Sequence, residues 1–264
     1  MRPAVAVCGK PDAAPCGRLR YARGVATHAV AMEHEAIRPL SIPIDGAEAV
    51  SALLQAPADA SACFVFAHGA GAGMTHPFMA AVASGLAERG IASLRYQFPY
   101  MERGSKRPDL PRVAHAAVRA AVAQAAGLLP GLPLLAGGKS FGARMTSQAQ
   151  AAAPLPGVRA LVFVGFPLHQ AGKPSDERAK HLADVDCPML FLQGTRDELA
   201  DLPLLHRVVE RLGERATLSL FEDADHSFHV RARSGRTDAQ VMTALLDTIA
   251  DWTVARGIAR GSEP

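Results

Sequence analysis

The stretch LPLLAGGKSFGARM, residues 132–145, decides the fold of this chain. Its first half is an apolar run of strand length that ends at Gly138, and a helix is predicted near 141–152. At the junction, GKSFG at 138–142 fits the pattern G-x-S-x-G. A serine on such a sharp turn from strand to helix has strained backbone angles, so the residues two before and two after it must be small. Both are glycine here, which makes Ser140 a candidate nucleophile.

Two other interpretations of this turn can be compared with the sequence. The pentapeptide taken alone does not exclude an ordinary glycine-rich turn. The letters GKS could also end a phosphate-binding P-loop, but that loop requires a glycine five positions before Gly138, where Pro133 stands. The P-loop is therefore excluded. A helix that follows Ser140 would also point the positive end of its dipole at developing negative charge.

The order of the predicted elements indicates an α/β sheet. Two short strands, RPLSIPI at 38–44 and AVSALLQA at 49–56, flank a turn at Asp45-Gly46, which predicts an opening hairpin. Strands and helices then alternate, which predicts a mostly parallel, doubly wound sheet. The expected strands are 62–68, 91–97, 132–138, 159–165, 188–194 and 216–222, and the expected helices begin near Pro77 and Val113, cover 141–152 and 204–213, and include a last one that carries Val241, Leu245, Ile249 and Trp252.

A second glycine-rich turn, HGAGAG at 68–73, follows the first central strand. In a fold with a serine elbow, this turn supplies the second half of an oxyanion hole. The expected donors are the backbone N–H groups of Phe141 and Ala70, with Gly71 as the alternative to Ala70. The glycines also resemble part of a dinucleotide-binding turn. Their spacing is G-x-G-x-G, however, and the next strand ends in RYQ at 95–97, without an acidic residue for a ribose.

A serine needs a base to become a nucleophile at neutral pH, and the base needs an orienting acid. Asp197 lies in QGTRDE, just after the strand at 188–194, and His226 lies in DADHSF, just after the strand at 216–222. The chain order of serine, acid and histidine fits a serine elbow on an α/β sheet, and so does their placement at strand ends. We therefore predict that Ser140, His226 and Asp197 form a catalytic triad.

Neighbouring residues compete for two of these roles. His229 occupies the same loop as His226 but lies further from the strand end. Glu198 and Asp201 compete with Asp197, and Asp201 is better placed as the N-cap of the next helix. The sequence therefore favours His226 as the base and Asp197 as the acid.

Composition limits what the chain can bind. The net charge of +3 is spread along 264 residues, of which 20% are charged, without a run of five like charges. A nucleic-acid or membrane-surface partner therefore has no electrostatic support. No apolar stretch approaches the roughly 20 residues that a spanning helix needs. The N-terminal apolar patch also ends before it becomes a secretory signal.

The cysteines indicate the compartment. Their positions show no paired metal-ligand spacing, so they are typical of free thiols in a reducing compartment, and we expect a cytoplasmic protein. Neither a metal nor a cofactor is expected. The expected partner is a small-molecule acyl substrate, and the sequence leaves the oligomeric state open. The four cysteines are Cys8, Cys16, Cys63 and Cys187.

Six motifs together point to a known family. They are HGAGAGMTHPFM at 68–79, RYQFPYMERGSKRP at 95–108, GGKSFGARM at 137–145, FVGFPLHQAGKP at 163–174, LFLQGTRDE at 190–198 and DADHSF at 223–228. From about Met32 onward the chain resembles the α/β-hydrolase-like proteins related to dienelactone hydrolases. That group includes testis-expressed and histone-acetyltransferase-complex-associated relatives in animals. Dienelactone hydrolases proper use a cysteine nucleophile, whereas this chain has Ser140, so lactone specificity is not carried over.

The alternating elements and the resemblance imply an α/β-hydrolase fold for residues 36–258. No large cap domain is expected, because the usual cap position, 166–185, spans only 20 residues. The start of the chain is rich in Ala, Arg, Gly and Pro and lacks periodicity, which predicts a disordered extension at 1–35. Residues 259–264 are expected to form a tail. A chain that begins at Met32, a candidate start, should be as stable and active as the full chain.

These residues predict a serine hydrolase that cleaves a carboxylic ester or a related acyl bond through an acyl-enzyme. The alternative is a non-catalytic interaction protein that keeps the fold, since fold does not imply function. Residues that follow strand ends are expected to line the substrate cleft, although each could equally be loop packing. They are His68, Phe98, Pro99, Tyr100, Met101, Phe166, Leu168 and His169.

Overall fold

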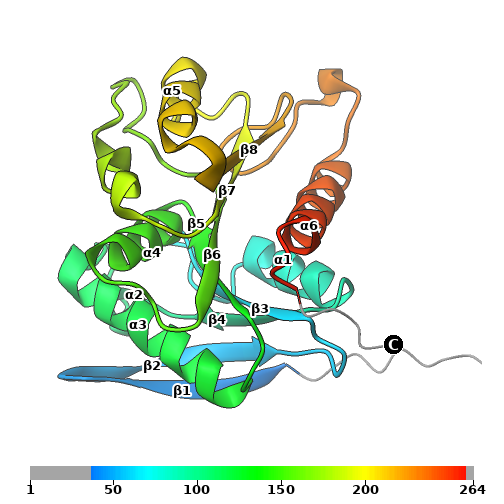
Figure 1. The fold of residues 1–264 in the computed structure, drawn as a ribbon. Coiled ribbons are helices and arrows are strands. Elements are labelled where there is room, and N and C mark those ends of the chain that lie inside the picture. The colour runs from blue at the N-terminus through cyan, green and yellow to red at the C-terminus, as the bar shows by residue number, and fades with distance from the viewer. Residues whose placement is uncertain (1–36, 260–264) are drawn as a thin grey trace, which may run out of the picture. The chain divides into compact units, whose positions relative to one another are not determined.

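The computed structural model describes residues 37–259 and shows one eight-stranded sheet with helices on both faces (Figure 1). The predicted extension at 1–35, the candidate start at Met32 and residues 260–264 of the predicted tail lie outside the described residues. Across the sheet the strands follow the order β1-β2-β4-β3-β5-β6-β7-β8. They are β1 (Arg38–Ile44), β2 (Ala47–Gln55), β3 (Ala62–Ala67), β4 (Ile91–Tyr96), β5 (Leu134–Lys139), β6 (Val158–Val164), β7 (Met189–Gly194) and β8 (Ala216–Phe221).

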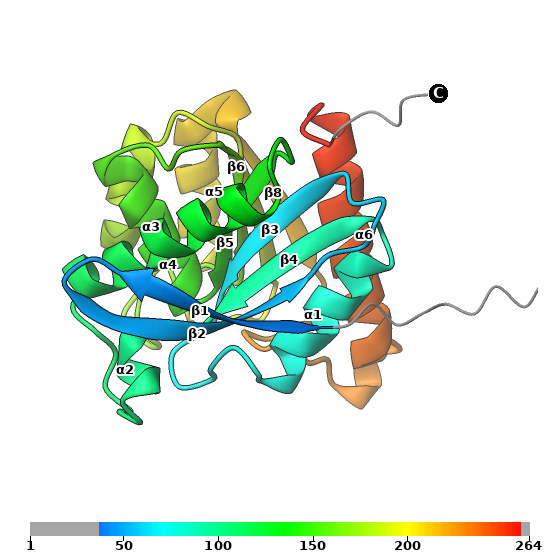
Figure 2. The same cartoon turned by 90° about the horizontal axis from the view of Figure 1, so that it is seen from below.

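The first two strands form the predicted hairpin. β1 pairs antiparallel with β2 across a turn at Asp45 and Gly46, and β2 pairs antiparallel with β4. Gly46 has a φ of +70°, a left-handed conformation that glycine adopts without strain. All other neighbouring pairs of the sheet are parallel. The mostly parallel sheet with an opening antiparallel hairpin is therefore confirmed, and Figure 2 shows it from the side of β1 and β2.

Helices cover both faces of the sheet (Figure 1). α1 and α6 pack on one face over one hydrophobic cluster, and α3, α4 and α5 pack on the other face over a larger cluster. The strands β3, β4 and β7 are buried along their whole length, as expected for continuous apolar runs between two helical layers. The helices are α1 (Pro77–Ala87), α2 (Pro99–Glu102), α3 (Pro111–Leu128), α4 (Phe141–Ala152), α5 (Leu202–Leu212) and α6 (Asp238–Ala255), and the 3-10 segments are η1 (Glu177–Asp184), η2 (Gly213–Arg215) and η3 (Ala232–Ser234).

α3 illustrates how the sequence selects a helix at these places. Pro111 occupies its first turn, where a missing N–H costs nothing and the fixed φ suits the helix. Ala114, Ala117, Val118 and Ala121 recur at spacings of three and four and are all buried. Because most of these side chains are small, α3 lies close to its neighbours α4 and β1.

The direction of the parallel strands determines where the candidate site lies. Their carboxyl ends meet at one edge of the sheet, where ligands bind in open α/β sheets. β5 ends directly before Ser140, Asp197 follows the end of β7, and His226 follows the end of β8. Three segments that are far apart in the sequence therefore reach the same edge.

Four short helical segments were not among the predicted elements: α2, η1, η2 and η3. α2 is a single turn that begins at Pro99, and η1 lies in the segment between β6 and β7. All four are too short to produce a hydrophobic period that can be recognised in the sequence. The segment between β6 and β7 carries only η1, which agrees with the predicted lack of a large cap domain.

Candidate active site

Ser140 sits in a sharp turn between β5 and α4. Its φ of 51° and ψ of −109° place a residue with a side chain in a strained conformation. A Cβ atom at Gly138 or at Gly142 would collide with the main-chain oxygen of Ala67 at the end of β3. The two glycines that frame the serine in the sequence are therefore required by close contact with a neighbouring strand, and the turn presents the serine hydroxyl at the edge of the sheet.

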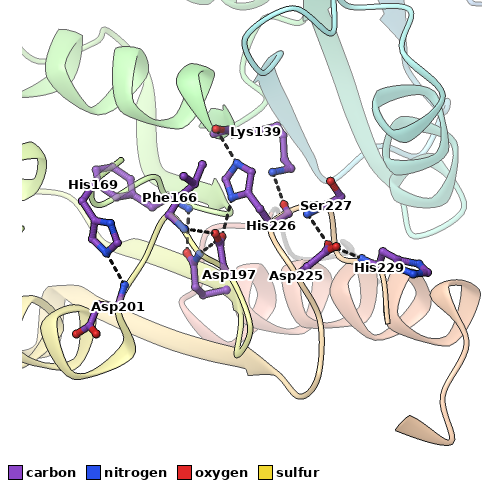
Figure 3. A network of polar contacts seen from close by, with 12 residues as sticks. Lys139, Phe166, His169, Asp197, Asp201, Asp225, His226, Ser227 and His229 are labelled. Carbon is purple, nitrogen blue, oxygen red and sulfur yellow. Dashed lines mark hydrogen bonds and ion pairs between the residues drawn. The ribbon is translucent and has the colours of Figure 1, made fainter. Parts of the chain in front are cut away.

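A continuous chain of hydrogen bonds joins the three residues predicted to form the triad, and Figure 3 shows the contact between Asp197 and His226. His226 Nδ1 lies 2.6 Å from Asp197 Oδ2, and His226 Nε2 lies 2.8 Å from Ser140 Oγ. An ionised carboxylate can only accept, so Nδ1 of the neutral ring carries the hydrogen and Nε2 accepts from the serine hydroxyl. This arrangement leaves the lone pair of Nε2 aimed at the proton that a general base would remove.

The carboxylate of Asp197 is buried, and all its partners are donors. Its Oδ1 accepts from the N–H of Leu199 at 2.8 Å, and its Oδ2 also accepts from Gln193 Nε2 at 2.5 Å. Gln193 Oε1 in turn accepts from the N–H of Phe166 at 2.9 Å, which fixes the amide orientation. Gln193 was missed in the sequence, although one polar residue in the otherwise apolar run MLFLQG was a signal.

The competing residues have other partners. Asp201 is the N-cap of α5, where its Oδ1 accepts from the N–H of Leu204 at 3.0 Å, as the sequence predicted. His229 is exposed and pairs with Asp238, with 2.8 Å between Nδ1 and Oδ2. Glu198 is exposed as well. Among these candidates the structure brings only Asp197 and His226 into contact with each other.

A second serine–histidine pair lies elsewhere in the domain. Ser147 Oγ is 2.8 Å from Nε2 of His181, in the contact between α4 and η1. Ser147 is fully buried in the middle of α4, and its hydroxyl donates to the main-chain oxygen of Arg144. Burial, mainly, lowers the pKa of His181 to about 4. Because this hydroxyl lies out of reach of a substrate, Ser147 and His181 hold the two segments together rather than form a site.

The three predicted oxyanion donors differ in how they are engaged. The N–H of Gly71 donates to Tyr100 Oη at 3.0 Å. No hydrogen bond from the N–H of Phe141 or of Ala70 occurs within the described residues. Phe141 is the first residue of α4, where the helix itself offers no acceptor. The N–H groups of Ala70 and Phe141 are thus available to an oxyanion, whereas the N–H of Gly71, the alternative to Ala70, already has an acceptor.

A cleft of about 420 Å³ opens beside Ser140. It differs from the cleft expected in the sequence, because none of the residues expected from strand ends lines it. Much of its lining comes from the loop after β3 and from the start of α1. The lining residues are Gly69, Ala70, Ala72, His76, Phe78, Met79, Lys139, Ser140, Leu199, His226 and Ser227.

Two of the residues expected in the cleft are buried histidines that connect loops. His68 Nε2 accepts from the N–H of Phe98 at 3.0 Å, and its Nδ1 lies 2.7 Å from the main-chain oxygen of Gly69. His169 Nε2 accepts from the N–H of Asp201 at 2.8 Å in the same manner. Each ring must therefore be neutral with its hydrogen on Nδ1. Burial also lowers the pKa of His68.

The other residues expected in the cleft pack behind the site. The rings of Phe98 and Tyr100 contact Phe141 edge to face, and the ring of Phe166 packs against other core phenylalanines. Of the two roles considered for these residues, lining of the cleft or loop packing, the structure shows loop packing. Phe98, Pro99, Tyr100, Phe166 and Leu168 are buried and Met101 is partly buried.

Among residues 37–259, no group of three or more His, Cys, Asp or Glu side chains is arranged to hold a metal ion. No helix in this part of the chain is long and apolar enough to cross a membrane.

Residues 60–254 match the family described as alpha/beta hydrolase domain. The chain belongs to this family. Solved structures with this fold include dienelactone hydrolase from Anabaena variabilis, with a TM-score of 0.67 and 21% identity over 86% of this chain and 100% of that one. A member of a/b serine hydrolase without lid from Xanthomonas campestris has a TM-score of 0.65 and 21% identity over 86% and 97%.

The esterase domain of a Rhodothermus marinus protein has a TM-score of 0.63 and 14% identity, and the match covers 83% of this chain and 98% of that domain. The α/β-hydrolase fold and the resemblance to dienelactone hydrolases are therefore confirmed. Membership of this family supports a hydrolytic role for the chain.

Proposed function

We propose that this α/β hydrolase is a serine hydrolase that cleaves a carboxylic ester or a related acyl bond through an acyl-enzyme. The observation that carries the proposal is the hydrogen-bond chain from Ser140 through His226 to Asp197, which opens onto the cleft of about 420 Å³. A nucleophile, a general base and an orienting acid are thereby held in sequence beside a space large enough for a small substrate.

In the first half of the reaction, Ser140 Oγ attacks the carbonyl carbon while His226 Nε2 takes its proton. The carbonyl oxygen becomes an oxyanion, which the N–H groups of Ala70 and Phe141 and the positive end of α4 stabilise. Asp197 stabilises the imidazolium. The bond between the acyl carbon and the alkoxy oxygen then breaks as His226 gives the proton to that alkoxy oxygen. The alcohol leaves, and an acyl group stays on Ser140 Oγ.

In the second half, a water molecule replaces the alcohol. His226 Nε2 removes a proton from the water, and the hydroxide attacks the acyl carbon. The tetrahedral intermediate forms at the same donors and collapses with release of the carboxylic acid. The proton passes from His226 to Ser140 Oγ, so the enzyme returns to its starting state without a cofactor.

The lining of the cleft supports a compact, apolar acyl group. Apolar surface in the lining of the cleft comes from Ala72, Phe78, Met79 and Leu199. A volume of about 420 Å³ lies at the lower end of the range for small-molecule sites. Esters of short or medium acyl chains therefore fit this space better than long lipid chains.

The alternative, a non-catalytic interaction protein with the same fold, is not supported by a specific observation. The strained backbone of Ser140 and the buried carboxylate of Asp197 both cost free energy. An interaction surface elsewhere on the domain would need neither feature. Both are explained when the serine is a nucleophile.

The experiment is labelling with a fluorophosphonate probe, which reacts only with an activated serine. The full chain should form one adduct by intact mass, and Ser140→Ala should form none. Ser147→Ala is the matched control, because Ser147 also lies against a histidine ring, and it should be labelled like the unmodified chain. Hydrolysis of an activated ester should fall at least on the order of a thousandfold in Ser140→Ala alone. A full chain that neither forms an adduct nor hydrolyses the ester would support the non-catalytic alternative.

A further inference from the structure

Lys139 lies next to the candidate nucleophile, and the mechanism above gives it no part. It ends β5, directly before Ser140, and its side chain reaches the main chain of His226 after β8. Its ammonium donates a hydrogen bond to the main-chain oxygen of His226 at 2.6 Å (Figure 3). The residue before the nucleophile thus holds the residue that carries the base.

Glycines at two neighbouring strand ends leave room for this contact. A Cβ atom at Gly69 would lie 3.5 Å from Lys139 Cγ. A Cβ atom at Gly165, which has a φ of +70°, would lie 3.1 Å from Lys139 Nζ and 3.5 Å from Nδ1 of the His226 ring. The space in front of Gly165 is therefore shared by the ammonium and the imidazole, and a larger residue there would displace one or the other.

The loop that carries His226 contains strain that needs support. Asp223 and Phe228 both have positive φ, at 58° and 64°, although neither is glycine. Within the loop, Asp225 Oδ1 accepts from the N–H groups of Ser227 and His229. From outside the loop, the Lys139 ammonium holds the carbonyl of His226 and lies 5.8 Å from the centre of the Phe228 ring.

We propose that Lys139 is a positioning residue, whose ammonium fixes the His226 main chain so that Nε2 stays within hydrogen-bond distance of Ser140 Oγ. The two ends of this connection lie on β5 and after β8, which are separated in the sheet by β6 and β7. Their relative position therefore depends on the packing of both intervening strands. A direct hydrogen bond between the two ends limits how far they can move relative to each other. The inference rests on the proposed function, because it concerns the geometry of the same triad.

The surroundings of Lys139 change the pKa of its ammonium group. Burial lowers the pKa of Lys139 to about 8, although the carboxylates of Asp197 and Asp225 oppose that change. These two carboxylates and the His226 ring are the titratable groups that face it, since the strand ends at Gly69 and Gly165 bring no charged side chain. No carboxylate within residues 37–259 forms an ion pair with Nζ. A neutral amine would bind the carbonyl less strongly than the ammonium does.

The test compares Lys139→Met, which keeps the length of the side chain and removes the donor, with Lys173→Met, which makes the same change at an exposed site. The substrate is one activated ester, and kcat and KM are measured between about pH 6.5 and pH 9.5. Lys139→Met should lower kcat at least about tenfold with little change in KM, because a small displacement of the base slows the reaction strongly. The fluorophosphonate labelling rate should fall in parallel, and Lys173→Met should match the unmodified chain in both measurements.

The pH profile supplies a readout that a purely structural role would not move. In the unmodified chain kcat should decline several-fold as the pH rises through about 8, and this decline should vanish in Lys139→Met. A variant with unchanged kcat and an unchanged alkaline decline would overturn the proposal. If Lys139→Met fails to fold, a profile of the unmodified chain that stays level to pH 9.5 would overturn it as well. An unmodified chain without labelling or turnover would instead reject the proposed function, and this inference would fall with it.

Discussion

The two oxygens of Asp197 have different partners, and this division determines the effect of a substitution. Oδ1 accepts from the N–H of Leu199, while Oδ2 accepts from Gln193 Nε2 and His226 Nδ1. An asparagine amide offers one acceptor and one donor, so it cannot satisfy both sets of donors. In either orientation of the amide, its NH₂ group would face one of the N–H donors that bind the carboxylate of Asp197.

Asp197→Asn should therefore keep the fold but lower kcat on an activated ester on the order of a thousandfold or more. The amide favours the wrong tautomer of His226 and cannot balance the charge of the imidazolium. Asp201→Asn makes the same chemical change at the N-cap of α5, where asparagine caps as well as aspartate, so kcat should stay within about twofold. The measurement is kcat/KM of both variants at one pH. If kcat/KM collapsed in Asp201→Asn while Asp197→Asn stayed active, the assignment of Asp197 as the acid would be wrong.

At the residue scale, the sequence could predict the three residues that the hydrogen-bond chain joins but not those that surround them. Ser140, Asp197 and His226 are recognisable because a motif and the chain order both apply to them. Gln193 and Lys139 follow no motif, since their importance depends on distances between different strand ends. The sequence gives the end of a strand but not the direction in which the next side chains point.

The cleft shows the same difficulty. Phe98 and Phe166 follow strand ends, as expected for lining residues, but both turn inward to the aromatic core. The N–H of Phe98 is held by the His68 ring, and that of Phe166 by Gln193. The wall of the cleft comes instead from the start of α1, at Phe78. Its position depends on how α1 lies on the sheet, which the sequence does not specify.

At the scale of elements, the position of α4 against β3 controls the turn at Ser140. Gly142 lies in the first turn of α4, and a Cβ atom there would lie 2.5 Å from the main-chain oxygen of Ala67 at the end of β3. Neither backbone can yield easily, because β3 is paired with β4 and β5 on both sides. An added methyl group would have to move α4, and with it the N–H of Phe141.

Gly142→Ala should accordingly destabilise the domain by about 1–3 kcal/mol and slow the fluorophosphonate reaction of Ser140. Gly127→Ala is the matched control, since Gly127 is an exposed residue near the end of α3 with no atom within 4 Å of the added carbon. There the same change should raise stability by about 0.5 kcal/mol through helix propensity and leave labelling unchanged. Melting temperatures and labelling rates of both variants test this. Equal melting temperatures for both variants would contradict the role assigned to the contact between α4 and β3.

The predicted elements matched the structure best where an apolar period or run was long. α3 and α6 could be located from the spacing of their apolar residues, and the parallel strands from their apolar runs. α2 and η1 could not, because one or two turns carry too little pattern. These short segments supply no side chain to the cleft beside Ser140, so missing them did not affect the prediction of the triad.

At the scale of the whole molecule, neutral histidines connect the parts that surround α4. His68 joins the end of β3 to the segment before α2, His115 on α3 lies against Gln148 of α4, and His181 of η1 lies against Ser147. Burial is the main cause that lowers the pKa of His68 and of His115, and it lowers the pKa of His181 to about 4. Each ring is therefore held neutral at a pH where it would be charged in the unfolded chain.

The sign of the resulting pH effect follows from proton linkage. Below about pH 6.5 the histidines of the unfolded chain take up protons, while these rings in the folded domain resist them. The unfolded state then binds more protons, so the free energy of unfolding falls as the pH falls. Each proton of difference contributes at most about 1.4 kcal/mol per pH unit, and less where the ring is partly exposed to solvent, as His115 and His181 are. For His181 the loss is complete near pH 4.

We therefore expect the melting temperature to drop by several degrees between about pH 7 and pH 5. His181→Gln should reduce that pH dependence, because glutamine can still hydrogen-bond to Ser147 but does not titrate. His206→Gln removes an exposed histidine on α5 and should leave the pH dependence as it is in the unmodified chain. Thermal unfolding of the three proteins across this range makes the comparison. Parallel curves for His181→Gln and the unmodified chain would show that His181 is free to take up a proton in the folded domain, and that its contact with α4 does not depend on a neutral ring.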